Sequence, residues 1–398
     1  MKRIAIVNQR YGLEVNGGSE LYTRQLAEHL AGSFEVDIIT TKALEYVDWA
    51  NYYEKDREVI GGVNVIRFPV DRLRAADFPK YSDDYLDEIA AGRSSLFAEL
   101  EFFDKQGPYC PKAVEYIREN KDNYDAFIFV TYLYYLTVNG LPEVADKAVF
   151  IPTAHDEPFM RFRLFGGLFN MPAAFGFLTD EEKALVQRKF RNSHIPSEVL
   201  GVGIDLPADI NAERFKKKYG LDDYIIYVGR IDGGKNCPDL FADFLAFKKE
   251  HRCGTKLVLM GKEVCEIPKS SDIISLGFVS DEDKYDGVAG AKALVLPSRY
   301  ESLSLSVLEA MAEGIPVIVN EECEVLKGHC LKSNAGLFYT GRTEFCLCLE
   351  RLLDDGELRA AMGRNGIEYV EKNYRWDIMV NKISRLIGCA GQGHSEIN

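Results

Sequence analysis

The sequence lacks the cysteine patterns of a metalloprotein or of a disulfide-bonded secreted domain. Its nine cysteines are odd in number and form no CxxC pair and no His/Cys ligand cluster, so we expect free thiols in a reducing compartment and no bound metal. No apolar run reaches the roughly 20 residues of a membrane span, and we find no secretory signal ahead of the first strand. These features predict a cytoplasmic protein whose membrane contact, if it has one, is peripheral and at the inner face.

A basic region is also missing. The formal net charge is −14, and both halves of the chain are acidic, which excludes a nucleic-acid-binding half. The 398 residues are 46% hydrophobic and 28% charged, the composition of an ordinary soluble protein. This length predicts two domains, each large enough for its own core.

Short apolar strands alternate with amphipathic helices along most of the chain. In the first half we expect strands at 3–8, 35–41, 63–69, 125–132, 148–154 and 175–179. In the second half we expect strands at 224–230, 256–261, 273–279, 293–298 and 316–320. The alternation predicts an α/β protein with two doubly wound parallel sheets.

The stretch 193–209 contains proline and glycine and interrupts this pattern, as a link between domains does. We therefore predict a first domain at 1–200 and a second at 201–375. A last helix at 376–398 is expected to cross back onto the first domain.

Two segments of the first half differ in composition from the alternating strands and helices. Residues 71–111 are polar, and we expect an irregular insertion there rather than core. The segment 159–169 is rich in phenylalanine. It fits either a core helix, which we favour, or a surface that meets a bilayer or a lipid-linked acceptor.

Two glutamates stand eight positions apart in the segment 296–314, which has the pattern of a strand end, a turn and a helix. Eight helical residues rise roughly 12 Å, about the span from a ribose diol across a diphosphate to an attached sugar. Glu309 is then placed to bind the ribose and Glu301 the sugar. Ser302 and Ser304 are helix-capping residue types, so amides at this helix start can receive a phosphate. The alternative is a solvated helix whose first-turn glutamate is favoured by the helix dipole.

A second motif lies at 227–236, where a strand ends in Gly229-Arg230 and Lys235 precedes the next helix. Ligands of parallel sheets collect at the carboxyl ends of the strands. There, a guanidinium and an ammonium can together stabilise a departing nucleoside diphosphate. No Ser or Thr follows Lys235, so this is not a Walker phosphate loop. The alternative is a surface turn with unrelated charges.

Two weaker signals lie in the first half. The turn Asn16-Gly17-Gly18-Ser19-Glu20 lets the backbone approach a ligand closely, and its lack of GxGxxG spacing argues against a dehydrogenase. His155 follows a buried strand and can hydrogen-bond a sugar hydroxyl. A structural histidine bonded to backbone fits this position equally well.

Taken together, these segments resemble the family 4 (group 1) retaining glycosyltransferases of the GT-B fold. The resemblance covers essentially the whole chain in order. Its parts are Gly-Gly near the start, His-Asp after mid-domain, Gly-Ile-Asp at the link, Gly-Arg…Lys-Asn, and Pro-Ser-Arg-Tyr-Glu…Leu-Glu-Ala-Met-Ala-x-Gly. It implies two Rossmann-like domains facing each other across a cleft, the first on the acceptor side and the second binding the nucleotide sugar.

The resemblance also implies roles for residues. Arg230 and Lys235 would bind the diphosphate, Glu301 the donor sugar and Glu309 the ribose, while His155 would face the sugar from the first domain. We expect catalysis to depend on His155, Arg230, Lys235 and Glu301. The further donor-binding positions are Gly17, Gly18, Gly229, Phe278, Val279, Ser302, Leu303, Ser304 and Leu305. Ser304 is a departure, because many relatives have glycine there.

The function that the resemblance implies is transfer of a sugar, with retention, from a nucleoside-diphosphate-sugar to a glycan or lipid-linked acceptor. A role in surface polysaccharide synthesis is expected, and the donor is the only small molecule required, with no cofactor and no metal. Two alternatives remain open from the sequence. One is a nucleotide-sugar epimerase or a phosphorylase of the same fold, and the other is a non-catalytic nucleotide-sugar-binding subunit.

Overall fold

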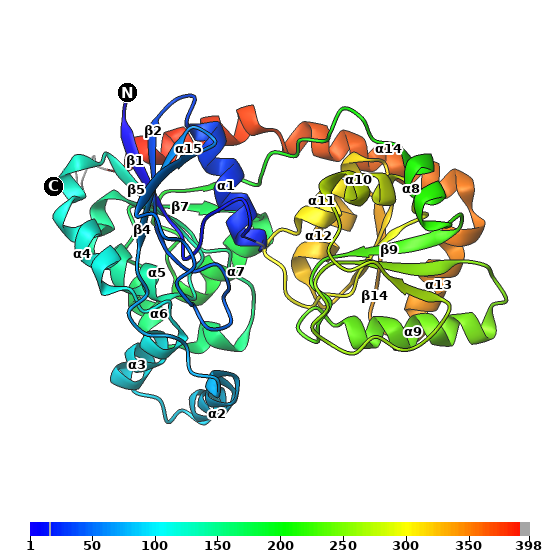
Figure 1. The fold of residues 1–398 in the computed structure, drawn as a ribbon, viewed down its shortest axis with the longest axis horizontal. Helices are drawn as coiled ribbons and strands as arrows, with labels where there is room; N and C mark the ends of the chain where they lie inside the picture. Colours follow the sequence, from blue (N-terminus) through cyan, green and yellow to red (C-terminus); the bar gives the residue numbers. More distant parts are fainter. Residues whose placement is uncertain (16, 391–398) are drawn as a thin grey trace. The chain divides into compact units, whose positions relative to one another are not determined.

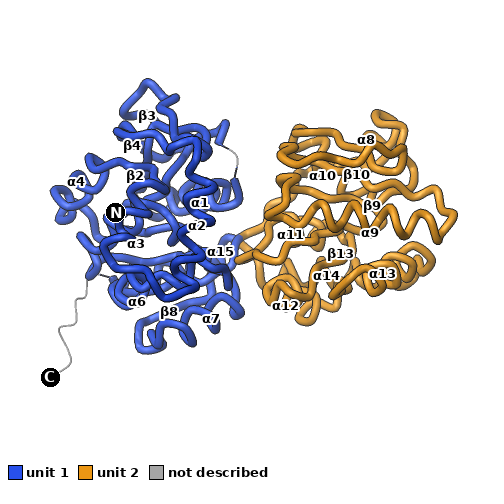
Figure 2. Tube along the Cα trace, turned by 90° about the horizontal axis from the view of Figure 1, so that it is seen from below, with its two compact units in different colours: residues 1–202, 376–398 blue, residues 203–375 orange. Residues whose placement is uncertain are grey.

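The computed structural model describes residues 1–15 and 17–390, which form two compact units (Figure 2). Unit 1 is Met1–Val202 together with the segment that starts at Trp376, and unit 2 is Gly203–Arg375. Unit 1 is therefore assembled from both ends of the chain, whereas unit 2 is one continuous segment.

Unit 1 is a sheet covered by helices (Figure 1). Its strands lie in the order β3-β4-β2-β1-β5-β6-β7-β8, and all neighbours are parallel except β3 and β4. The strands are β1 (Arg3–Val7), β2 (Glu35–Thr41), β3 (Arg57–Ile60), β4 (Val63–Phe68), β5 (Ala126–Val130), β6 (Ala148–Ile151), β7 (Ala174–Phe177) and β8 (Ser197–Val199). The α-helices are α1 (Gly18–Leu30), α2 (Phe78–Ala90), α3 (Leu96–Gln106), α4 (Pro111–Glu119), α5 (Tyr135–Gly140), α6 (Leu164–Leu168), α7 (Asp180–Phe190) and α15 (Trp376–Cys389). Short 3₁₀ turns are η1 (Lys121–Asn123), η2 (Leu141–Lys147) and η3 (Pro158–Arg161).

Unit 2 repeats this plan with a fully parallel sheet in the order β11-β10-β9-β12-β13-β14. Its strands are β9 (Tyr224–Val228), β10 (Lys256–Met260), β11 (Ile273–Ser275), β12 (Leu294–Leu296), β13 (Val317–Asn320) and β14 (Gly336–Tyr339). Its helices are α8 (Ala212–Tyr219), α9 (Cys237–Glu250), α10 (Asp281–Ala289), α11 (Leu305–Ala312), α12 (Glu324–Ser333), α13 (Arg342–Asp354) and α14 (Gly356–Asn373).

The strand order fixes where a ligand can bind. In unit 2 the chain runs outward from β9 to β11 on one side, then returns to β12 beside β9 and runs outward on the other side. Unit 1 reverses in the same way between β1 and β5. Ligands of such sheets bind where the order reverses, at the carboxyl ends of the strands. The loops that follow β9 and β12 are therefore the expected ligand loops of unit 2.

The expected α/β alternation and the two doubly wound sheets are confirmed, and both sheets are parallel apart from the antiparallel edge strand β3 of unit 1. Every residue of β5, β6 and β12 is buried, as in strands covered on both faces, and such continuous apolar runs are visible in a sequence. The prediction missed three edge strands, β3, β8 and β14. These are short and mostly half-buried, so their residues alternate too weakly to stand out.

The expectation of an irregular insertion at 71–111 was wrong. Helices α2 and α3 occupy most of that segment, and Phe78, Phe102 and Phe103 belong to the buried core of unit 1. Phe102 packs edge-on against Phe162 with ring centroids 5.0 Å apart. The polar residues of these helices outnumber the few aromatic side chains that hold them to the core, and this hid the helices in the sequence.

The phenylalanine-rich segment 159–169 belongs to the core, the alternative that we favoured. Phe162, Phe165 and Phe169 are at most 2% exposed, so they do not form a bilayer-facing surface. No helix in the described part of the chain is both long and apolar enough to span a membrane. All nine cysteines are free thiols.

Helix α15 returns to unit 1. The Trp376 ring stacks on His29 of α1 at 3.9 Å between centroids, and Lys382 Nζ donates to the Val199 carbonyl at the end of β8, at 2.6 Å. The helix ends at Cys389, and 391–398, the rest of the segment predicted as helical, lies outside the described residues.

Candidate functional site

The turn after β9 is shaped by one glycine and one aspartate. Gly229 has a φ of 153° and lies so close to Gly261 that a Cβ on Gly261 would stand 1.9 Å from the Gly229 carbonyl oxygen. Asp232 then accepts from the Arg230 guanidinium through Oδ2 and from the Lys235 amide through Oδ1 at 2.8 Å. Asp232 therefore fixes the turn from which both predicted cations project.

Lys235 joins the ends of two neighbouring strands. Its Nζ donates to Glu301 Oε1 at 2.6 Å, and Glu301 follows β12 in the chain. The Lys235 and Glu301 side chains are 29% and 13% exposed, whereas the Arg230 side chain is 41% exposed. The sheet thus brings together Gly229, Arg230, Lys235 and Glu301, which the sequence placed in two separate motifs.

The start of α11 departs from the expected capping. Ser304 is the N-cap residue, but it has φ 72° and ψ 91° and its side chain makes no capping hydrogen bond. A positive φ favours glycine, so the backbone explains why a glycine suits this position. Because first-turn amides have no partner within a helix and no N-cap side chain serves them here, the amides of Leu305 and its neighbours remain suited to an anion.

Glu309 lies one turn further along α11 and is 8% exposed. Its Oε1 accepts from Lys284 Nζ at 2.9 Å and from Tyr285 Oη at 3.0 Å, both from α10. The pKa of Tyr285 is raised, mainly by burial and secondly by the nearby Glu309 charge. Burial, again followed by the Glu309 charge, raises the pKa of Glu313 to about 8, and both Glu313 carboxyl oxygens are buried without a hydrogen-bond partner.

Phe278 and Val279 lie in the loop between β11 and α10. The loop is anchored because the Gly277 carbonyl accepts from the Gly261 amide at 2.8 Å, and Gly261 in turn packs on Gly229. Phe278 is 72% exposed. An exposed aromatic ring therefore stands in a loop that is tied to the end of β10.

The glycine turn of unit 1 covers a buried ion pair. Gly17 has a φ of 154°, and a Cβ there would lie 2.2 Å from Glu20 Oε2, whereas one on Gly18 would meet nothing. Glu20 accepts from Arg10 at 2.5 Å and from Gln9 at 3.0 Å. Asn16, the first residue of this motif, lies outside the described residues.

His155 follows β6 in unit 1. Its Nδ1 stands 3.4 Å from Glu157 Oε1, and Glu157 also accepts from the Tyr132 hydroxyl. Thr131 and Thr153, after β5 and β6, both have positive φ values, 75° and 52°. Strained backbone of this kind clusters at functional sites, so this edge of unit 1 is a candidate part of a functional site.

Four residues near the predicted positions were missed by sequence reasoning. Asp232 could have been found, because an aspartate three residues before Lys235 is typical of a side-chain-stabilised turn. Lys284, Tyr285 and Glu313 gave no signal of their own. Lys284 and Tyr285 reach Glu309 only through the packing of α10 beside α11.

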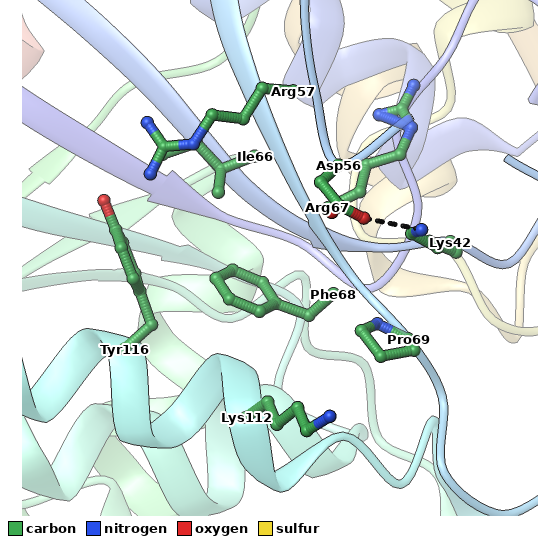
Figure 3. Close-up of a pocket in the computed structure, with 9 residues that line it drawn as sticks. All are labelled: Lys42, Asp56, Arg57, Ile66, Arg67, Phe68, Pro69, Lys112 and Tyr116. Atoms are coloured by element: carbon green, nitrogen blue, oxygen red, sulfur yellow. Dashed lines mark ion pairs between the residues drawn. The ribbon is translucent and has the colours of Figure 1, made fainter. Parts of the chain in front are cut away.

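Two surface hollows contain none of the predicted residues. The first, of about 340 Å³, lies beside the β3–β4 edge of unit 1, where Figure 3 shows the ion pair between Lys42 and Asp56 and the ring of Phe68. The second, of about 540 Å³, includes Asp223 and Thr255, which precede β9 and β10 at the opposite edge of the unit 2 sheet. The charged groups that converge after β9 and β12 are therefore separate from both hollows.

Within the described residues, no group of three or more His, Cys, Asp or Glu side chains is arranged to hold a metal ion.

Known proteins resemble this chain in sequence. Residues 209–369 match the family model described as glycosyl transferases group 1. An uncharacterized glycosyltransferase of Methanocaldococcus jannaschii is 22% identical over 421 residues, which cover 94% of this chain and 95% of that protein. The O-antigen chain mannosyltransferase B of Escherichia coli is 28% identical over 189 residues, 45% of each protein.

Solved structures resemble the chain over nearly its whole length. Sucrose-phosphate synthase from Thermosynechococcus elongatus superposes with a TM-score of 0.72 at 18% identity, covering 97% of this chain and 98% of that one. HepE of Anabaena, solved in complex with UDP and glucose, gives a TM-score of 0.70 at 13% identity, covering 98% and 100%. At such identities the likeness concerns the fold.

Proposed function

We propose that this chain, which has the GT-B fold and matches the model of the group 1 glycosyl transferases over residues 209–369, transfers a sugar, with retention, from a nucleoside diphosphate to a glycan or lipid-linked acceptor. The observation that carries the donor assignment is the contact between Lys235 and Glu301 across the ends of β9 and β12. It places a cation and a sugar-binding carboxylate side by side where the strand order reverses.

The charges suit the departure of a diphosphate. Cleavage of the anomeric bond leaves a diphosphate anion and a sugar with oxocarbenium character. Before any ligand arrives, Asp232 holds the Arg230 guanidinium and Glu301 holds the Lys235 ammonium. Both cations are therefore positioned in advance and would stabilise the anion with little reorganisation, which is the main source of electrostatic catalysis. The amides at the start of α11 would hold the distal phosphate, and Glu309 the ribose.

Retention requires attack from the face that the leaving group occupies. A phosphate oxygen of the departing diphosphate can accept the acceptor's proton on that face, so no protein nucleophile is needed. Glu301 then acts as a ligand of the sugar hydroxyls rather than as a nucleophile. His155 in unit 1 would contact the donor sugar, and Gly17 and Gly18 would lie near the phosphates and the acceptor.

The acceptor and the cellular role rest on similarity. The Escherichia coli relative is an O-antigen chain mannosyltransferase, which supports a glycan or lipid-linked acceptor and a role in surface polysaccharide synthesis. HepE was solved with UDP and glucose, which supports a nucleotide-sugar donor. We propose a cytoplasmic enzyme, working at the inner membrane face when its acceptor is lipid-linked, with neither a metal nor a cofactor.

The test is donor turnover by the purified protein. Uridine, guanosine and adenosine diphosphates and their sugars are first screened by thermal shift, and hydrolysis or transfer of the stabilising donor is then measured. Lys235→Ala should lower kcat/KM for the donor at least about a hundredfold, because a charge-assisted contact to the leaving group is lost. Lys217→Ala, an exposed lysine of α8, is the matched control.

Turnover by Lys235→Ala at the rate of the Lys217→Ala control would refute the phosphate assignment. Stabilisation by donors without turnover by the wild type would point instead to a nucleotide-sugar-binding subunit.

A further inference from the structure

We infer that Lys284 and Tyr285 of α10 are positioning residues for the donor's ribose: they hold one oxygen of Glu309 so that the other is presented to the ribose hydroxyls. This inference rests on the proposed use of a nucleotide sugar. It assigns a role in donor binding to α10, a helix for which the sequence alone predicted no function.

The contacts divide the two oxygens of Glu309. Lys284 Nζ and Tyr285 Oη both donate to Oε1, at 2.9 and 3.0 Å, and Oε2 accepts no hydrogen bond from any described residue. A carboxylate oxygen has lone pairs for about two hydrogen bonds, so Oε1 is saturated. Oε2 is the oxygen left for two adjacent hydroxyl donors.

The two side chains that hold Glu309 come from consecutive residues of α10 and also contact each other. The Lys284 ammonium lies 4.1 Å from the centroid of the Tyr285 ring, a cation–π contact that holds the lysine in place. Glu309 is therefore fixed before the ligand binds, and less conformational entropy is lost on binding.

The ion pair between Glu309 and Lys284 suits a neutral ligand such as the ribose diol. The Glu309 and Lys284 side chains are 10% and 18% exposed, and a carboxylate so deeply buried requires a partner charge. Lys284 supplies that charge. A ribose adds two hydroxyl donors and no net charge, so the ion pair stays balanced when the nucleotide is bound.

Glu313 makes this balance depend on pH. The groups that act on its carboxyl are Glu309 on the same helix, and Lys284 and Asp286 on α10, while it acts in turn on Tyr285 of α10 and on Tyr224 of β9. With a pKa of about 8, Glu313 is protonated at pH 7 and neutral. When it ionises above pH 8, a second carboxylate competes with Glu309 for Lys284, which should weaken the hold on Glu309.

The experiment compares ribose with deoxyribose. Dissociation constants of UDP, GDP and ADP and of their 2′-deoxy counterparts are measured by calorimetry for the wild type, Lys284→Met and Tyr285→Phe. The wild type should prefer the ribonucleotide by about tenfold, the worth of a hydrogen bond to a charged group. In Lys284→Met the preference should fall towards unity and the donor KM should rise about tenfold with kcat within twofold of the wild type.

Tyr285→Phe removes only one hydroxyl, so it serves as a second variant in case Lys284→Met does not fold. It should lose part of the same preference for ribose. Lys284→Arg should restore much of it. Lys292→Met is the matched control, because Lys292 forms an equally close ion pair, 2.8 Å to Asp223, at the opposite edge of the unit 2 sheet. An unchanged ribose preference in both folded variants would overturn the inference. Failure of the wild type to bind any of the diphosphates would instead overturn the proposed function.

The proposed pH dependence is tested with the variant Glu313→Gln, which cannot ionise at this position. The wild-type KM for the donor should rise between pH 7.5 and about 9 as Glu313 loses its proton, whereas the KM of Glu313→Gln should stay level. The same rise in both proteins would exclude Glu313 as its cause.

Discussion

Ser304 combines a serine side chain with a backbone that suits glycine. Its φ of 72° and ψ of 91° place it outside the regions that L-residues prefer, and strain of this kind costs of order 1–3 kcal/mol. Its hydroxyl makes no cap, and its one local contact among the described residues is a long hydrogen bond of 3.4 Å with the Ser306 hydroxyl, which offsets little of this strain. The backbone at this point is therefore set by the loop and the helix on either side.

Replacing Ser304 by glycine should relieve that strain. The free energy of unfolding of Ser304→Gly should rise by about 1 kcal/mol, because the relieved strain exceeds the extra entropy that glycine gives the unfolded chain. Ser306→Gly, two residues further and within α11, should instead lose about 1 kcal/mol. Urea denaturation measures both, and equal losses in the two variants would contradict the strain assignment.

At the scale of elements, the turn between β9 and α9 depends on Asp232. This carboxylate is 9% exposed and binds both the Arg230 guanidinium and the Lys235 amide, yet it has no assigned contact with a donor. Its effect on the reaction would be exerted through the Arg230 guanidinium and through the turn that carries Lys235.

Asp232→Ala should therefore lower kcat/KM for donor turnover by about tenfold or more, since the charge-assisted contacts that fix the Arg230 guanidinium and the backbone before Lys235 are lost. Steady-state kinetics with the donor found by thermal shift measure the effect. Asp222→Ala removes an exposed aspartate of the same unit and should change nothing. An Asp232→Ala enzyme as active as this control would show that the cations need no such support.

Elements also differ in how well the sequence predicts them. The central strands β5, β6, β9 and β12 are short, apolar and bounded by turn residues, so their type and order could be predicted. Lys235 and Glu301 could be predicted to lie at the same edge of the sheet because each follows such a strand, whereas their direct contact was not predicted. Helix α2 could not be predicted, because its one buried aromatic residue, Phe78, is outnumbered by charged neighbours. The contact of α10 with Glu309 depends on how two helices pack, which no local pattern encodes.

At the scale of the whole molecule, unit 1 depends on its last helix. Ile383 and Ile387 of α15 are 0% and 1% exposed, and the helix adds the Trp376–His29 stack and the Lys382–Val199 hydrogen bond. Most of the apolar face of α15 is therefore buried within unit 1.

Ile383→Ala should lower the free energy of unfolding of unit 1 by about 2–5 kcal/mol, the usual cost of deleting a buried aliphatic side chain. Asn381→Ala, on the exposed face of the same helix, should change it by less than about 0.5 kcal/mol. Thermal unfolding of the full chain should show an earlier transition in Ile383→Ala only. A thermal profile of Ile383→Ala that matches Asn381→Ala would contradict the dependence of unit 1 on α15.

The composition of unit 1 from both ends of the chain sets an order on biosynthesis. As the polypeptide leaves the ribosome, unit 2 has all of its residues once Arg375 has emerged, although it began later. Unit 1 must wait with an uncovered surface until α15 is made. Folding of unit 1 is thereby coupled to the synthesis of α15, because a chain released before Trp376 would carry a complete unit 2 and an incomplete unit 1.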